Sequence, residues 1–142
     1  MTGKESYGAG QEPPWPRLGG DDLPRGATLE ELAKAWFDPD EEEWAEQDAT
    51  EVCYGNPEAT WEFILLLLNE AKTHDDLGRI AAGPLEGFVQ AFAHDQIDRI
   101  EREAEHNARF RTALKGVWFS GRNDDVTLRL RALGCHDLNA KA

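Results

Sequence analysis

Residues 57–71 read PEATWEFILLLLNEA, and this stretch decides the fold. Pro57 and Glu58 suit the first turn of a helix, where proline loses no hydrogen bond and an acid complements the helix dipole. The positions that follow are apolar nearly all round a helix, namely Trp61, Ile64, Leu65, Leu67 and Leu68. A helix that lacks a polar face is buried. We therefore expect residues 57–71 to form the central helix of a helical protein.

Two helices are predicted on the N-terminal side of this stretch. Thr28, with Glu31 three residues later, has the pattern of a capping box and starts a helix that Pro39 ends. Residues 40–54 form the second helix, and Gly55 is suited to end it. Its inner face consists of Trp44, Ala45, Val52 and either Ala49 or Asp48.

Further helices are predicted on the C-terminal side. Residues 73–76 begin a helical segment that Gly83-Pro84 breaks or sharply kinks, because proline in a helix interior removes a hydrogen bond. Pro84 opens a new helix, and a second apolar stripe at helical spacing follows at Ile97, Ile100 and Ala104.

The last two helices are predicted from their caps. Asn107 caps a short helix that runs to about Phe119, and residues 124–133 form the last helix, which Gly134 terminates. No segment alternates apolar and polar residues over more than about five positions. The sequence therefore predicts an all-α fold: a compact bundle of seven or eight short antiparallel helices, with a helical-repeat-like stack as the alternative.

Residues 1–27 differ in composition from the rest of the chain, with six glycines and four prolines. We predict an extended N-terminal tail there, followed by a single acidic helical domain over residues 28–142. A tail of this composition is disordered, or Trp15 between its prolines anchors it to the domain or to a partner.

The charge balance restricts the partners. The chain holds 28 Asp and Glu against 15 Lys and Arg, a net charge of −13. This argues against nucleic acid and anionic membranes as direct partners, because both bind basic surfaces, and favours a protein with a basic surface. The longest apolar run, residues 63–68, is far shorter than the about 20 residues that span a bilayer. Without a signal-peptide pattern, and with Cys53 and Cys135 as distant thiols, we expect a cytoplasmic protein.

Acidic residues concentrate in the first part of the chain. Residues 1–56 hold 14 acids and 4 bases, whereas residues 57–142 hold 14 acids and 11 bases. Within residues 38–51 there are eight acids and no base: Asp38, Asp40, Glu41, Glu42, Glu43, Glu46, Asp48 and Glu51. We predict that these acids form a protein-binding surface, with an apolar anchor in Trp44, Trp36 or Phe37. The alternative is a solvated helix face whose acids lie near an N-terminal dipole.

No catalytic, cofactor or metal site is predicted. The four histidines include no pair at the i, i+4 spacing of a helical zinc site. The acidic run that starts at Asp38 departs from a calcium loop, with Glu43 in place of the glycine and Ala49 in place of the bidentate glutamate. The motifs of nucleophilic serine enzymes and phosphate-binding loops are absent from the sequence. An enzyme that uses carboxylates is the remaining enzymatic alternative.

Four motifs occur in order: WEFI at residues 61–64, AAGPLE at 81–86, IDRIE at 97–101 and RFRTALKGVW at 109–118. Together they resemble a family of small bacterial all-helical domains of unknown function, over roughly residues 30–133. The resemblance implies an all-α fold, a bacterial or phage-like origin and no assigned activity. It assigns no catalytic residue.

These observations predict a non-enzymatic protein-binding module. Its most concrete form is a small acidic inhibitor that blocks a basic partner surface: an immunity protein that neutralises a toxin, or a phage-type antagonist of a defence nuclease. The alternative is a structural or regulatory protein-interaction domain without an inhibitory role.

Overall fold

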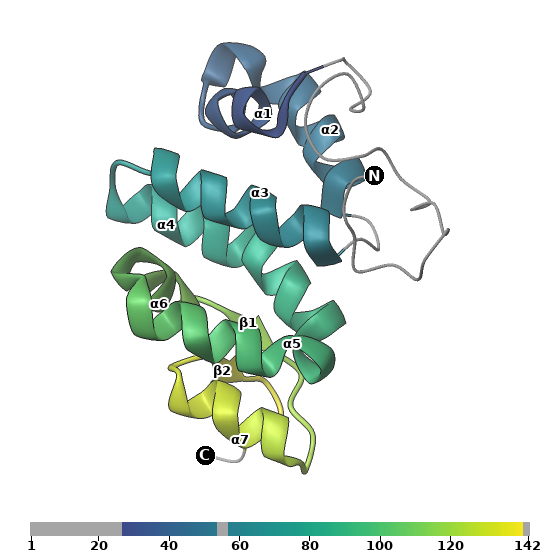
Figure 1. Ribbon diagram of the computed structural model, residues 1–142, viewed down its shortest axis with the longest axis vertical. Coiled ribbons are helices and arrows are strands. Elements are labelled where there is room, and N and C mark those ends of the chain that lie inside the picture. Colours follow the sequence, from purple (N-terminus) through teal and green to yellow (C-terminus); the bar gives the residue numbers. More distant parts are fainter. Residues whose placement is uncertain (1–26, 54–56, 141–142) are drawn as a thin grey trace. The chain divides into compact units, whose positions relative to one another are not determined.

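The computed structural model describes residues 27–53 and 57–140 of the chain (Figure 1). The tail predicted over residues 1–27 lies almost wholly outside the described residues, Trp15 included. The described residues form seven α-helices and two strands of two residues each. The predicted all-α fold is therefore confirmed.

Contacts within the chain divide it into two compact units, Met1–Glu70 and Ala71–Ala142. We call them the N-terminal unit and the C-terminal unit and describe each by itself. The single helical domain expected over residues 28–142 stays a prediction.

The N-terminal unit contains α1 (Leu29–Trp36), the 3-10 helix η2 (Pro39–Glu41), α2 (Glu42–Cys53) and α3 (Pro57–Glu70). The predicted capping box starts α1: the Glu31 backbone N–H donates to the Thr28 hydroxyl over 3.0 Å, and the Thr28 N–H donates to the Glu31 carboxylate over 2.9 Å. α1 packs against both α2 and α3, and both neighbours therefore cover its apolar stripe.

The core of the N-terminal unit follows the predicted apolar positions. On α1 the buried stripe includes Leu29, Leu32, Ala33 and Trp36. On α3, Phe63, Ile64 and Leu67 have no exposed surface, as expected for a central helix. α3 contributes seven buried residues along its 14-residue length, more than α1 or α2, which contribute five and four.

The C-terminal unit contains the remaining elements. They are α4 (His74–Ile80), the π-helical segment η3 (Ala81–Leu85), α5 (Glu86–His106), α6 (Ala108–Leu114), β1 (Trp118–Phe119), α7 (Asp125–Ala132) and β2 (His136–Asp137). α5 packs against η3, α6, β1 and α7, so this 21-residue helix organises the unit.

The predicted kink at Gly83-Pro84 is confirmed. Gly83 has φ −118° and ψ −105°, outside the helical region, while the residues on either side of η3 are helical. Pro84 disfavours a helical conformation in the residue before it and lacks the N–H of an ordinary helix residue. The chain therefore bends here and continues directly into α5.

The helix predicted to run from Asn107 to about Phe119 is correct at its start and wrong at its end. The Asn107 side chain caps α6 by accepting the Phe110 N–H over 3.1 Å. α6 then ends at Leu114, and Trp118 and Phe119 pair in parallel with His136 and Asp137. A two-residue strand is too short to show an alternating pattern, so its periodicity is indistinguishable from that of a helix.

Two glycines near this turn have identifiable reasons. A Cβ on Gly116 would lie 3.0 Å from the Ala81 Cβ, so a side chain here would press the turn after α6 away from η3. Gly134 has φ +102° and ends α7 as predicted, because only glycine adopts that conformation without strain.

The buried face of α3 predicts a stability effect. Replacing Leu67 with Ala deletes a fully buried side chain and should lower the free energy of unfolding by about 2–5 kcal/mol. Leu128→Ala is the control, because Leu128 is 61% exposed on α7 and its truncation should cost about 0.5 kcal/mol or less. Urea unfolding followed by circular dichroism measures both. Equal losses in the two variants would contradict the buried position of Leu67.

Candidate functional site

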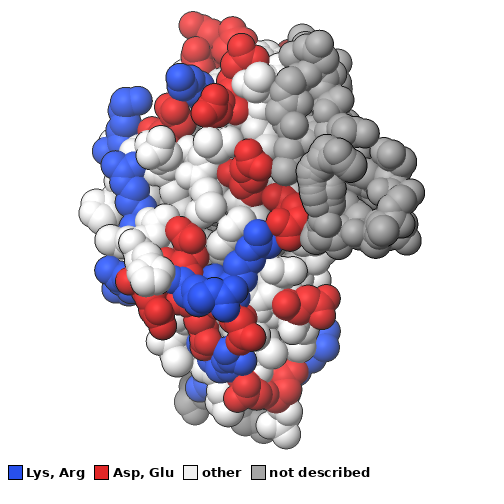
Figure 2. All heavy atoms as spheres, in the orientation of Figure 1, with Lys and Arg blue, Asp and Glu red and all other residues white. Residues whose placement is uncertain are grey.

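The N-terminal unit carries a strongly one-sided charge. Residues 27–70 contain 13 acids, and Lys34 is their single basic residue. Residues 71–142 contain 11 acids and 11 bases. In Figure 2, Asp and Glu side chains gather where α1 and α2 lie, at the top of the view. The acids and bases balance in the C-terminal unit, whereas they do not balance in residues 57–142, so the boundary between the units separates the charges more sharply than a boundary at residue 56.

The acids of η2 and α2 are mostly exposed. The exposed ones are Asp38, Asp40, Glu42, Glu43, Glu46 and Glu51, and we call these six residues with Glu41 and Trp44 the acidic surface. Local structure offsets part of the repulsion between these like charges. Asp38 caps η2 by accepting the Asp40 N–H over 2.9 Å, and Glu42 and Glu43 lie in the first turn of α2, where the helix dipole stabilises negative charge.

Trp44 lies within the acidic surface and is half-buried. Its indole N–H donates to the Glu41 carboxylate one turn earlier, and Glu41 is itself half-buried. The hydrogen bond orders the indole in the free protein. Trp44 was predicted to lie on the inner face of its helix, and the structure places it between interior and solvent.

Asp48, predicted as one of the eight acids of the binding surface, is buried with 3% of its surface exposed. It lies beside Ala49 on the inner face of α2, which has Ala45, Asp48, Ala49 and Val52 as its buried residues. The two alternatives for the inner face are thus both correct. Asp48 cannot contact a partner from this position, so the acidic surface does not include it.

The other predicted apolar anchors also differ in how far they are exposed. Trp36 is 8% exposed and belongs to the core, and Phe37 is half-buried with its ring edge against Trp36, at 5.0 Å between centroids and 88° between planes. Trp15 lies outside the described residues. Within the described part of the chain, Trp44 is therefore the predicted anchor that lies among the exposed acids.

Glu62 on α3 has a raised pKa. Partial burial, and next the negative charge of Glu30 on α1, raise the pKa of Glu62 above its usual range. Both causes favour the neutral carboxyl group. Lys34 is the one Lys or Arg within residues 27–70, so a single basic side chain in this range faces 13 acids.

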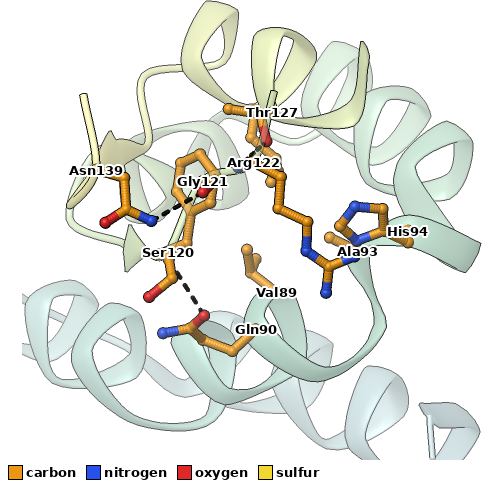
Figure 3. A pocket seen from close by; sticks show the side chains of 11 residues that line it. Val89, Gln90, Ala93, His94, Ser120, Gly121, Arg122, Thr127 and Asn139 are labelled. Atoms are coloured by element: carbon orange, nitrogen blue, oxygen red, sulfur yellow. Dashed lines mark hydrogen bonds between the residues drawn. The ribbon is translucent and has the colours of Figure 1, made fainter. Parts of the chain in front are cut away.

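A second feature lies in the C-terminal unit, where the loop after β1 meets α5 and α7. It is a hollow of ≈ 270 Å³ whose lining includes His94, Ser120, Arg122 and Asn139 (Figure 3). None of these residues was among the predicted site residues. The side chains that complete the hollow come from α5 and from the C-terminal residues, and no sequence spacing signals that meeting.

The N-cap of α7 lies beside this hollow. The Asp124 carboxylate accepts the Thr127 N–H over 2.9 Å, and its other oxygen lies 2.9 Å from His94 Nε2. The hydrogen bond from the Thr127 backbone, then those from the His94 ring and the Thr127 hydroxyl, lower the pKa of Asp124 to about 2. These bonds fix the start of α7 against α5.

Among residues 27–53 and 57–140, no three His, Cys, Asp or Glu side chains gather as a metal site requires. In the same residues, no helix is both long and apolar enough to cross a bilayer.

The chain belongs to a family of unknown function, DUF6869, whose sequence profile matches residues 33–137. The predicted resemblance to a family of unknown function is therefore confirmed, and the match includes α2 to α7 whole. No curated protein and no solved structure matches the chain.

The lowered pKa of Asp124 predicts a pH dependence of stability. A carboxyl whose pKa is lower in the folded than in the unfolded state stabilises the fold above its unfolded pKa of about 3.9. That contribution is lost as the pH falls towards about 2. Asp124→Asn keeps a capping oxygen but removes the charge. We therefore expect wild type to be more stable than Asp124→Asn at about pH 6, with the difference shrinking at about pH 2.5.

Urea unfolding at the two pH values measures this difference. Asp95→Asn, which removes an exposed acid on α5, is the control and should have a small effect at both pH values. A difference between wild type and Asp124→Asn that does not change with pH would contradict the role assigned to the carboxylate.

Proposed function

We propose that this chain is a non-enzymatic protein-binding module that uses its acidic surface to bind a basic surface on another protein. The single observation that carries the proposal is the charge of the N-terminal unit, with 13 acids and one base in residues 27–70. The six exposed carboxylates of η2 and α2 create a negative field that attracts a basic partner and orients its approach.

Trp44 supplies the apolar contact that carboxylates lack. Its hydrogen bond to Glu41 already orders the ring, so little side-chain entropy is lost when a partner covers it. Tryptophan is among the residues that contribute most at interfaces, because it buries a large area and retains one polar group. An ordered tryptophan ringed by acids suits a partner surface that combines Lys or Arg with an apolar cleft.

In its most concrete form the proposal is a small inhibitor: an immunity protein that neutralises a toxin, or a phage-type antagonist of a defence nuclease. Enzymes that act on nucleic acid expose basic surfaces to bind phosphate. An acidic surface competes with phosphate for such a site, and the bound module excludes the substrate. The alternative, a structural or regulatory interaction domain, would use the same surface and leave the partner active.

We also place the protein in the cytoplasm as part of this proposal. Cys53 and Cys135 are both free thiols. Burial, partly offset at Cys53 by a hydrogen bond with Thr60, raises the pKa of Cys53 to about 11, and burial raises that of Cys135 to about 12. Such thiols are unreactive at neutral pH, and a reducing compartment is compatible with them.

The acidic surface can be tested by removing charge without changing shape. In the variant Glu42→Gln, Glu43→Gln, Glu46→Gln, three exposed acids of α2 become neutral, while Glu41 is left in place to hold Trp44. The partner is first captured from an extract of the native host with wild-type protein and then purified. We expect the partner to associate with the variant roughly tenfold more slowly, because three charges that attract it are lost. We also expect the association rate of the variant to depend less on salt, because less charge remains for ions to screen over the Debye length of about 8 Å.

The matched control removes the same charge elsewhere. Asp75→Asn, Asp95→Asn, Glu105→Gln neutralises three exposed acids of α4 and α5 and should leave the association rate within about twofold of wild type. Surface plasmon resonance at two salt concentrations measures both variants. Equal slowing would assign the effect to net charge alone and reject the acidic surface. An assay of the partner's own activity separates an inhibitor from a module that only binds.

Trp44 should affect the dissociation rate constant of the complex. Trp44→Ala removes the proposed anchor and should raise the dissociation rate about tenfold or more, with a much smaller change in association. Trp44→Phe keeps an aromatic ring but loses the N–H that Glu41 accepts, and we expect an intermediate rate. The same resonance experiment reports both values. A dissociation rate that is the same for all three proteins would remove Trp44 from the interface.

A further inference from the structure

The hollow in the C-terminal unit has a chemistry opposite to that of the acidic surface. It has a volume of ≈ 270 Å³, and none of its lining residues is an Asp or a Glu. Its polar lining includes Arg122 and His94, whereas its floor is apolar, with Val89, Ala93, Phe119 and Leu130 buried. A concave site with an apolar floor and a few directed polar groups is the usual form of a small-ligand site.

Arg122 supplies the charge of this site. In Figure 3 its side chain extends from the loop across the hollow towards His94. Its backbone N–H donates to the Thr127 hydroxyl over 2.8 Å. Within the part of the chain that the structure describes, its guanidinium group has no hydrogen bond or ion pair. The planar guanidinium group is therefore available to bind two oxygen atoms of a carboxylate or a phosphate.

The neighbouring carboxylates are engaged elsewhere. Asp124 lies beside His94 and caps α7. Asp137 accepts the N–H groups of Gly121 and Asn139 over 2.8 Å and 2.9 Å. These acids are thus held by bonds within the protein and do not line the hollow, whose lining has Arg122 as its one Lys or Arg and contains no carboxylate.

The loop is held rigidly enough to present Arg122 in one place. The Ser120 N–H donates to the Gln90 amide oxygen over 3.3 Å, and the Asn139 amide donates to the Gly121 carbonyl over 2.8 Å. A Cβ on Gly121 would lie 2.2 Å from the Asp137 carboxylate, so the carboxylate fills the space that any other residue would need. Because side chains from three segments fix the loop, the hollow exists before a ligand arrives.

We propose that this hollow binds a small organic anion, with one carboxylate or phosphate group held by Arg122 and a compact apolar body against Val89 and Phe119. The volume sets the size, because it lies just below the range of about 300–1,000 Å³ that holds drug-sized ligands. The ligand is therefore a compact molecule of roughly one ring with one anionic group. This site lies within the C-terminal unit and does not depend on the acidic surface.

The probes are phenyl phosphate and benzoate, which join one anionic group to one apolar ring. Benzamide has the ring without the charge, and inorganic phosphate has the charge without the ring. Each is titrated into the full chain while NMR records the backbone amide signals of Ser120, Gly121 and Arg122. We expect saturating shifts for phenyl phosphate or benzoate, with a dissociation constant of about 1 mM or lower. The two controls should bind at least about tenfold more weakly.

Two variants that each lose one positive charge test the role of Arg122. Arg122→Gln should weaken the better probe about tenfold, because a charge-assisted pair of hydrogen bonds is lost. Arg131→Gln removes an exposed arginine of α7 that does not line the hollow, and it should change binding less than about twofold. Unchanged amide signals elsewhere in the spectrum establish that both variants are folded.

Four results would overturn the proposal. No shift with either anionic probe would mean that the hollow binds no such ligand. Benzamide binding as tightly as benzoate would reduce it to an apolar cavity. Inorganic phosphate binding as tightly as phenyl phosphate would show that the hollow binds the anionic group alone and that its apolar floor does not contact the ring. Equal weakening by Arg122→Gln and Arg131→Gln would show that the net charge of the unit, and not a contact with Arg122, attracts the anion.

Discussion

The C-terminal unit depends on the backbone constraint that Pro84 imposes. The residue before a proline is disfavoured in a helical conformation, and Gly83 takes φ −118° and ψ −105° in response. The bend separates the short α4 from the long α5, although the chain passes between them without a loop. Every other element of the unit except β2 then packs directly on α5 or on η3. A straight helix through these residues would leave α6 without the surface that the bend creates.

α5 contacts its neighbours through different interactions along its length. Near its start, the Glu86 and Gln90 side chains accept the N–H groups of Trp118 and Ser120, so the open edge of β1 is satisfied by a helix in place of another strand. Further along, Asp98 and Glu101 accept hydrogen bonds from Arg129 of α7. Hydrogen bonds to Arg129 lower the pKa of Glu101. The Arg129 pair is partly exposed, so it orients α7 more than it stabilises it.

Local signals explain why so much of this fold is predictable from sequence. The caps at Thr28 and Asn107 lie where their side chains predict, and each accepts the expected backbone N–H. These are interactions within three residues, and a sequence records them directly. The apolar stripes of α1 and α3 are likewise local patterns that burial follows. What fails is the segment after Leu114, where Trp118 pairs with His136, because that choice depends on contacts between residues far apart in sequence.

The candidate sites show the same limit. The acids of α2 were visible as a run, but their exposure was not, and helical periodicity turns Asp48 inward while its neighbours face solvent. The hollow could not be predicted, because Gln90, Ser120, Arg122 and Asn139 come from a helix, a turn and a terminal segment. Only the packing of α5 against α7 brings these segments together.

The contrast between the two units bears on where a partner binds. In residues 71–142 acids and bases are equal in number, and several carboxylates have structural partners: Asp98 and Glu101 hold Arg129, Glu86 holds β1, and Asp137 holds Gly121. Those carboxylates stabilise the unit by bonds within it. In residues 27–70 the chain supplies Lys34 alone as a counter-charge, so mutual repulsion of the acids is relieved mainly by salt or by an external cation. A basic protein surface relieves that repulsion and buries Trp44 in the same step, which is why we assign the protein contact to the acidic surface and the small anion to the hollow of the C-terminal unit.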